Sequence, residues 1–110
     1  MLSSMSEESS HCARVFFHRG DLPQARQWYE RAVQEDRTAG DAPALSASLG
    51  NLGNVYAMAG DYAQAERCYR EVLALQRGQP DQHAIGQTLV NLGNVQAETG
   101  RLEQARSYYL

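Results

Sequence analysis

The chain has 110 residues, of which 43% are hydrophobic and 21% are charged, a composition that is ordinary for a globular protein. The net charge is −3, and all ten basic residues are arginines interleaved with acidic residues, which excludes the basic stripe of a nucleic-acid-binding protein. No apolar run approaches the roughly 18 residues of a membrane helix, and residues 1–8 lack the features of a secretory signal. We therefore expect a cytoplasmic protein that binds neither nucleic acid nor membrane.

The cysteine and histidine residues do not form a recognisable metal site or disulfide framework. Cys12 and Cys68 lie 56 residues apart with no CxxC pair, so we expect two buried free thiols. His11 and His18 lie about two helical turns apart, which is too far for both to hold one metal ion. We therefore expect no metal and no cofactor.

The first third of the chain is predicted to form an irregular start followed by two helices. Residues 1–8 are rich in serine and glutamate, and we expect them to be frayed or disordered. Helices are predicted at residues 5–19 and 22–36, with Asp21 between them as an N-cap whose carboxylate accepts from free backbone N–H groups. Residues 37–41 then form a linker.

The middle third repeats this arrangement with clearer signals. Asp41 caps a helix predicted at residues 42–59, and Pro43 fits its first turn. Gly60 ends that helix, and Asp61 caps the next one at residues 62–77. The apolar residues recur at helical spacing: Leu45, Leu49, Leu52, Val55 and Tyr56, then Tyr62, Ala65, Tyr69, Val72 and Leu73.

The last third is predicted to contain a linker at residues 78–81 and helices at 82–99 and 101–110, with Gly100 between them. Arg101 replaces the capping aspartate, so we expect the final helix to begin less firmly. The third unit stops at Leu110, in mid-helix by comparison with the second unit. We expect a fragment of a longer array or, as the alternative, an edge that pairs with a second copy.

A pattern of Gly, Gln-Ala and Tyr recurs at intervals of forty residues from Gly20, Gly60 and Gly100. Residues 51–69 and 91–109 match at ten of nineteen positions, which indicates stacked helix–turn–helix repeats that bury their apolar faces against one another. Gly53 and Gly93 recur in mid-helix, where glycine costs roughly 1 kcal/mol against alanine. We expect these glycines, together with Ala65 and Ala105 on the second helices, to allow close helix packing.

These repeats resemble the tetratricopeptide repeat. The second unit carries the family's pattern at Leu49, Leu52, Gly53, Tyr56, Ala65, Tyr69 and Val72, and the third at Leu89, Leu92, Gly93, Ala105 and Tyr109. The forty-residue period is similar to that of kinesin light chains and Pins-type polarity scaffolds. The resemblance implies an all-α, right-handed solenoid of antiparallel helix–turn–helix repeats, about two and a half to three in number. They form one domain at residues 9–110, with repeats near 9–36, 46–77 and 86–110, the last incomplete.

The resemblance also implies an interaction scaffold that binds a peptide or partner segment on the concave face, which the first helix of each repeat lines. The expected binding residues are Arg14, Phe17, Asn51, Asn54, Met58, Gln87, Asn91, Asn94 and Glu98. An asparagine amide has two donors and an acceptor, so it can pair with any peptide backbone. The alternative is that these amides cap or bridge neighbouring helices.

Two other functions remain open at this stage. One is self-assembly into a dimer through the C-terminal edge, and another is a regulatory role as part of a larger protein. No nucleophile–base pair or pair of carboxylates stands out, so we expect no enzymatic activity.

The repeat pattern makes a prediction about helix packing. Because Ala65 is expected where two helices approach closely, Ala65→Leu should overpack the contact and lower the free energy of unfolding by roughly 1–3 kcal/mol. Thermal melting followed by circular dichroism measures the change. An unchanged melting temperature would place Ala65 outside the contact.

Overall fold

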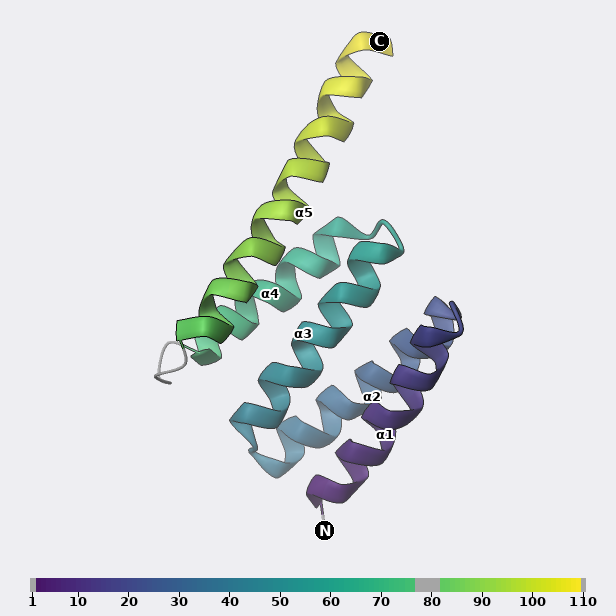
Figure 1. Ribbon diagram of the computed structural model, residues 1–110, viewed down its shortest axis with the longest axis vertical. Coiled ribbons are helices and arrows are strands. Elements are labelled where there is room, and N and C mark those ends of the chain that lie inside the picture. The colour runs from purple at the N-terminus through teal and green to yellow at the C-terminus, as the bar shows by residue number, and fades with distance from the viewer. Residues whose placement is uncertain (1, 77–81, 110) are drawn as a thin grey trace.

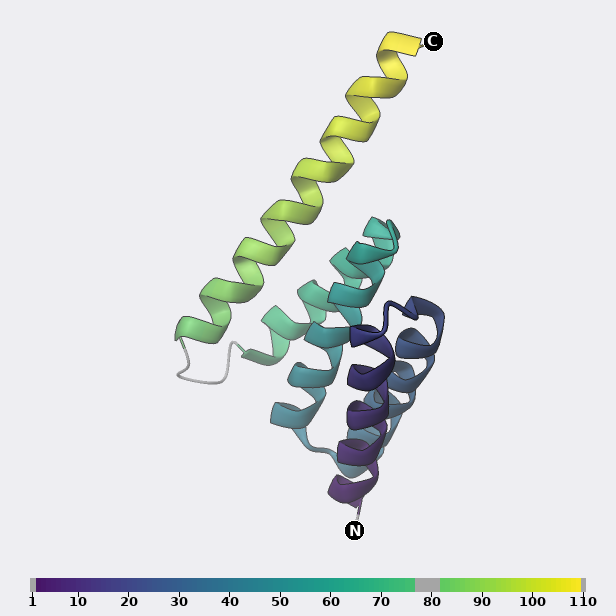
Figure 2. The same ribbon diagram turned by 45° about the vertical axis from the view of Figure 1, so that its right-hand side comes forward.

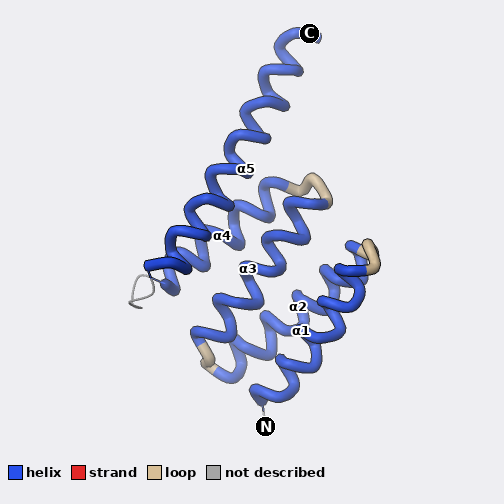
Figure 3. The backbone as a smooth tube through the Cα atoms, in the orientation of Figure 1, coloured by secondary structure: helices blue, strands red, loops and turns tan. Residues whose placement is uncertain are grey.

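The computed structural model describes the backbone of residues 2–76 and 82–109, and the side chains of residues 6–76 and 87–103. All regular structure in these ranges is helical (Figures 1 and 3). The helices are α1 (Leu2–His18), α2 (Leu22–Ala39), α3 (Ala42–Met58), α4 (Tyr62–Gln76) and α5 (Gln82–Tyr109). The all-α fold expected from the sequence is therefore confirmed.

The helices stack in chain order. α1 and α2 form one antiparallel hairpin, α3 and α4 form the next, and α5 packs along α4 (Figures 1 and 2). The result is an elongated solenoid with principal extents of 54 × 33 × 20 Å. Each helix contacts mainly its neighbours in sequence, as expected for a repeat protein.

The turns use the residues that the sequence marked for them. Gly20, Gly40 and Gly60 have φ values of 80°, 68° and 83°, a left-handed conformation that glycine adopts without a steric penalty. After each of these glycines an aspartate, Asp21, Asp41 or Asp61, accepts a hydrogen bond from the backbone N–H group three residues on, at 3.2, 3.1 and 3.4 Å. α2 continues to Ala39, so the first linker is shorter than predicted. The second predicted linker, residues 78–81, lies outside the described residues.

The N-terminal segment differs from the expectation. Residues 2–8, expected to be frayed or disordered, are the first turns of α1. Ser6 and Ser9 are buried, and the Ser9 hydroxyl donates a hydrogen bond of 2.5 Å to Glu35 on α2. Serines that look like surface residues in the sequence are thus small, partnered groups in the contact between α1 and α2.

The C-terminal third also differs. The predicted helices at 82–99 and 101–110 form one continuous helix, α5, and its C-terminal half extends beyond the other helices (Figures 1 and 2). At the position of Asp21 and Asp61, Arg101 has no carboxylate to cap a new helix, and its guanidinium instead donates to Glu98 one turn earlier. The sequence prediction of a turn at Gly100 is therefore wrong for this structure.

Close packing occurs at one of the two mid-helix glycines. A Cβ atom built on Gly53 would lie 2.7 Å from Cε1 of Tyr69, so the ring occupies the space that a side chain would need. Ala65 is fully buried on the same α4 helix, as predicted. Gly93 has no atom within 4 Å of the corresponding position, because no second helix folds back over α5. Ala105, its predicted counterpart, lies outside the described side chains.

Buried polar pairs join one hairpin to the next. The Ser48 hydroxyl on α3 donates to the Asp36 carboxylate on α2 at 2.6 Å. Forty residues later, the Thr88 hydroxyl on α5 donates to the Gln76 amide oxygen on α4 at 3.1 Å. All four residues are buried, and the repeated position indicates that these pairs fix the register between stacked units.

The two glycines should respond in opposite ways to the same substitution. Gly53→Ala forces the added methyl group against the buried Tyr69 ring, and we expect it to lower the free energy of unfolding by about 1 kcal/mol or more. Gly93→Ala adds helix propensity in open space, and we expect a gain of up to about 1 kcal/mol. Urea unfolding of both variants measures the pair. Equal effects of the same sign would contradict the packing difference.

Candidate binding groove

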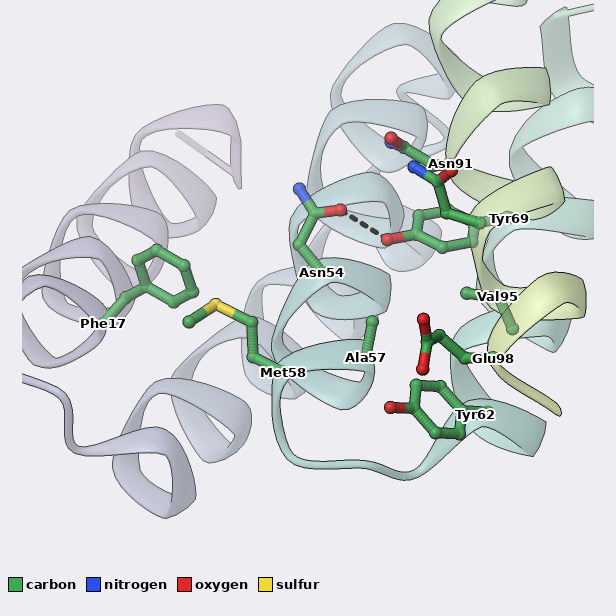
Figure 4. Close-up of a pocket in the computed structure, with 10 residues that line it drawn as sticks. Phe17, Asn54, Ala57, Met58, Tyr62, Tyr69, Asn91, Val95 and Glu98 are labelled. Atoms are coloured by element: carbon green, nitrogen blue, oxygen red, sulfur yellow. Dashed lines mark hydrogen bonds between the residues drawn. The ribbon is translucent and has the colours of Figure 1, made fainter. Parts of the chain in front are cut away.

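A cavity of about 480 Å³ opens between the first helices of the three units (Figure 4). Its walls come from α1, α3 and α5, and α4 adds two tyrosines. The lining residues are Phe17, Asn54, Ala57, Met58, Tyr62, Tyr69, Asn91, Asn94, Val95 and Glu98. The size is sufficient for a large side chain of a partner.

The cavity brings together six of the nine binding residues expected from the sequence: Phe17, Asn54, Met58, Asn91, Asn94 and Glu98. Asn51 lies next to it, in a shallow depression of about 60 Å³ that Phe17, Tyr29 and Asn54 also line. Gln87 and Arg14 are outside both. Gln87 donates a hydrogen bond of 3.2 Å to the Asn91 side chain, one turn along α5. Burial raises the pKa of Tyr29, and the positive charge of the nearby Arg14 lowers it in part.

The asparagine side chains are only partly available to a ligand. The Asn54 amide oxygen accepts a hydrogen bond from the Tyr69 hydroxyl, which joins α3 to α4 (Figure 4). The Asn91 oxygen accepts from Gln87. In both residues the amide NH₂ group remains to donate. Asn94 lines the cavity, is exposed and has no hydrogen-bond partner among the described residues, so its amide is available to a ligand.

The sequence prediction missed Tyr62, Tyr69 and Val95. It placed these residues in the core, and Tyr69 and Val95 are indeed 2% and 3% exposed. Each nevertheless presents an edge to the cavity. Burial raises the pKa of Tyr69 to about 12, so its hydroxyl stays neutral and serves as a hydrogen-bond donor to Asn54. The only signal in the sequence for this role was that a tyrosine, which carries a polar hydroxyl, occupies a core position at Tyr69.

The described residues hold no group of three or more His, Cys, Asp or Glu side chains that could bind a metal ion. Cys68 is a buried free thiol, as expected, whereas Cys12 is only half-buried. In the described part of the chain, no helix is long and apolar enough to span a bilayer.

Comparison with known proteins identifies the family. Two family profiles described as tetratricopeptide repeat match the chain, at residues 9–78 and 51–110. The chain therefore belongs to the tetratricopeptide repeat family, as its repeated residues indicated. Domains of this family are generally protein–protein interaction modules. No curated protein sequence matches the chain.

Solved structures of the same fold agree with this assignment. The tetratricopeptide repeat domain of FLU from Arabidopsis has a TM-score of 0.84 at 17% sequence identity, over 99% of this chain and 92% of that one. BtubC (BKLC) from P. vanneervenii has a TM-score of 0.81 at 19% identity, over 93% of this chain and 42% of that one. At these identities, the likeness shows the fold alone.

The buried tyrosine predicts a pH dependence of stability. The pKa of Tyr69 is raised from 10.0 to about 12 in the folded protein, so the folded state keeps a proton that the unfolded state loses between these values. We therefore expect the free energy of unfolding to fall as pH rises through this window, and to fall less steeply in Tyr69→Phe. Urea unfolding across the window measures the slopes, and equal slopes would contradict the assignment.

Proposed function

We propose that the chain is a protein-interaction module that binds a peptide or an extended partner segment along α1, α3 and α5, with one partner side chain in the cavity. The observation that carries this proposal is the cavity itself, which gathers residues from three successive units. A ligand that spans the units contacts all three, and a repeat scaffold presents such a surface without any moving part.

The apolar wall of the cavity supports the proposal. Met58 is 64% exposed at the end of α3, and its side chain points towards the half-buried Phe17 on α1 (Figure 4). A thioether adapts its shape to different apolar partners. Covering these two side chains with a partner residue would remove apolar surface from water, which favours binding.

The polar side chains of the cavity wall could orient the ligand. The NH₂ groups of Asn54 and Asn94 and the unpaired oxygen of Asn94 can pair with the backbone of an extended peptide. Because Tyr69 fixes the Asn54 side chain, its donor group is held in place before the ligand arrives, which lowers the entropy cost of binding. This pairing does not depend on the peptide's sequence.

We propose that the chain is a scaffold rather than an enzyme, because the side chains that line the cavity do not form a catalytic arrangement. The Tyr69 hydroxyl is neutral at physiological pH, and the Glu98 carboxylate forms an exposed ion pair with Arg101. The described residues that line the cavity include no Ser, Thr, Cys, His or Lys side chain.

Self-assembly is a second candidate, favoured by one observation. Leu89 and Val90 on α5 are 53% and 57% exposed, whereas Leu49, the counterpart of Leu89 on α3, is 3% exposed. A second copy that covers α5 would remove this apolar surface from water.

A matched pair of double variants separates the two candidates. Met58→Ala/Asn94→Ala removes an apolar and an amide side chain from the cavity, and Leu102→Ala/Gln96→Ala removes the same types from exposed positions of α5 outside it. We expect a partner captured from a host lysate, and then measured as a purified peptide, to bind the cavity variant at least about tenfold more weakly. The control variant should bind it like wild type.

The other outcomes are equally informative. A partner that binds both variants like wild type would place the contact outside the cavity. Capture of the chain alone, lost in a Leu89→Ala/Val90→Ala variant, would support self-assembly through α5 instead.

A further inference from the structure

Two of the inner segments that form the cavity, α3 and the first half of α5, carry no formal charge. α3 contains no Asp, Glu, Lys or Arg in its seventeen residues. In α5, Glu98 is the first residue of these types after the helix begins at Gln82. Glu98 is also the only such residue among those that line the cavity. The Glu98 carboxylate is therefore the one formal charge among the residues that line the cavity, and Arg101, which pairs with it, lies outside that lining.

Glu98 can exchange its ion pair with Arg101 for one with a cationic group of a ligand. Its partner, Arg101, comes from the same helix, and the two side chains are 43% and 71% exposed. Ion pairs of this kind are weak, because water and salt screen them and both side chains lose freedom. Figure 4 shows the Glu98 carboxylate above the ring of Tyr62 and beside Ala57, inside the cavity rather than on its outer side.

The end of α3 adds to the negative potential. Ala57 and Met58 are the last residues of this helix and line the cavity, and the last turn of α3 contains no basic residue. The C-terminal end of a helix carries a partial negative charge that favours cations nearby. The ring face of Tyr62 also attracts a cation through its quadrupole. The Glu98 carboxylate, the end of α3 and the Tyr62 ring therefore favour a positive group at this place, and the Asp61 carboxylate caps the opposing positive end of α4.

We propose that the cavity takes a basic side chain, arginine or lysine, from the bound peptide. The cationic head pairs with Glu98 in place of Arg101, and the aliphatic stem packs against Ala57, Met58 and Val95. This inference rests on the proposed function of the groove and names the chemistry of its ligand. A purely apolar side chain would leave Glu98 paired only with Arg101 and gain no ion pair of its own, and an acidic one would be repelled.

Selection from a phage-displayed library of random peptides tests this inference. The targets are the wild-type chain, Glu98→Gln, and the control Glu103→Gln, which removes an exposed carboxylate of α5 outside the cavity. We expect peptides selected on wild type and on Glu103→Gln to share a basic residue at one position, and peptides selected on Glu98→Gln to lack it. A synthetic peptide from the wild-type selection should bind Glu98→Gln about tenfold more weakly or worse, and Glu103→Gln unchanged.

The possible failures are distinguishable. Selected peptides without a shared basic residue, whose binding is still lost in Met58→Ala/Asn94→Ala, would overturn this inference and leave the groove as the binding site. Peptides that bind the cavity variant like wild type, or the absence of any selected peptide, would count against both the inference and the proposed function.

Discussion

The contact between the Tyr69 ring and Gly53 is the one on which the rest of the structure depends. A Cβ atom at residue 53 would collide with the ring, so glycine alone allows α3 and α4 to approach this closely. Tyr69 also belongs to the cluster in which Leu92 and Val95 of α5 pack on α4. The hydroxyl holds Asn54 at the wall of the cavity. One residue thus connects a hairpin, the next unit and the candidate site.

The third unit shows what happens without this contact. Gly93 stands where Gly53 does, but nothing packs on it, and α5 continues through Gly100. One difference between the units is the residue after the turn glycine. Asp61 accepts a hydrogen bond from the start of α4, whereas Arg101 bonds back to Glu98 within the same helix. The residue after the turn glycine thus stabilises a new helix start in the second unit and the continuing helix in the third.

Most of the fold could be predicted from the sequence because its signals are local. The glycines with positive φ, the aspartate caps and the apolar stripes each act within a few residues. The start of α1 was not predictable in this way, since the helix is favoured by packing and by the Ser9–Glu35 bond across 26 residues. For the site, assigning residues to the first helix of each repeat predicted that Asn54 and Met58 line the groove, but it did not predict Tyr69 there. Its role depends on which edge of a buried ring remains open.

The stacking of the units and the chemistry of the groove are held by different residues. The buried Ser48–Asp36 and Thr88–Gln76 pairs lie where one hairpin meets the next, and none of these residues lines the large cavity. Substitutions at Met58, Asn94 or Glu98 therefore leave the register of the solenoid unchanged, because these side chains are partly or fully exposed and make no contact that holds two units together. Asn54 is the exception. It is tied to Tyr69, so a change there alters both the groove and the α3–α4 hairpin. If the groove binds a ligand as proposed, its specificity is adjustable at the exposed positions of α3 and α5 and constrained at Asn54.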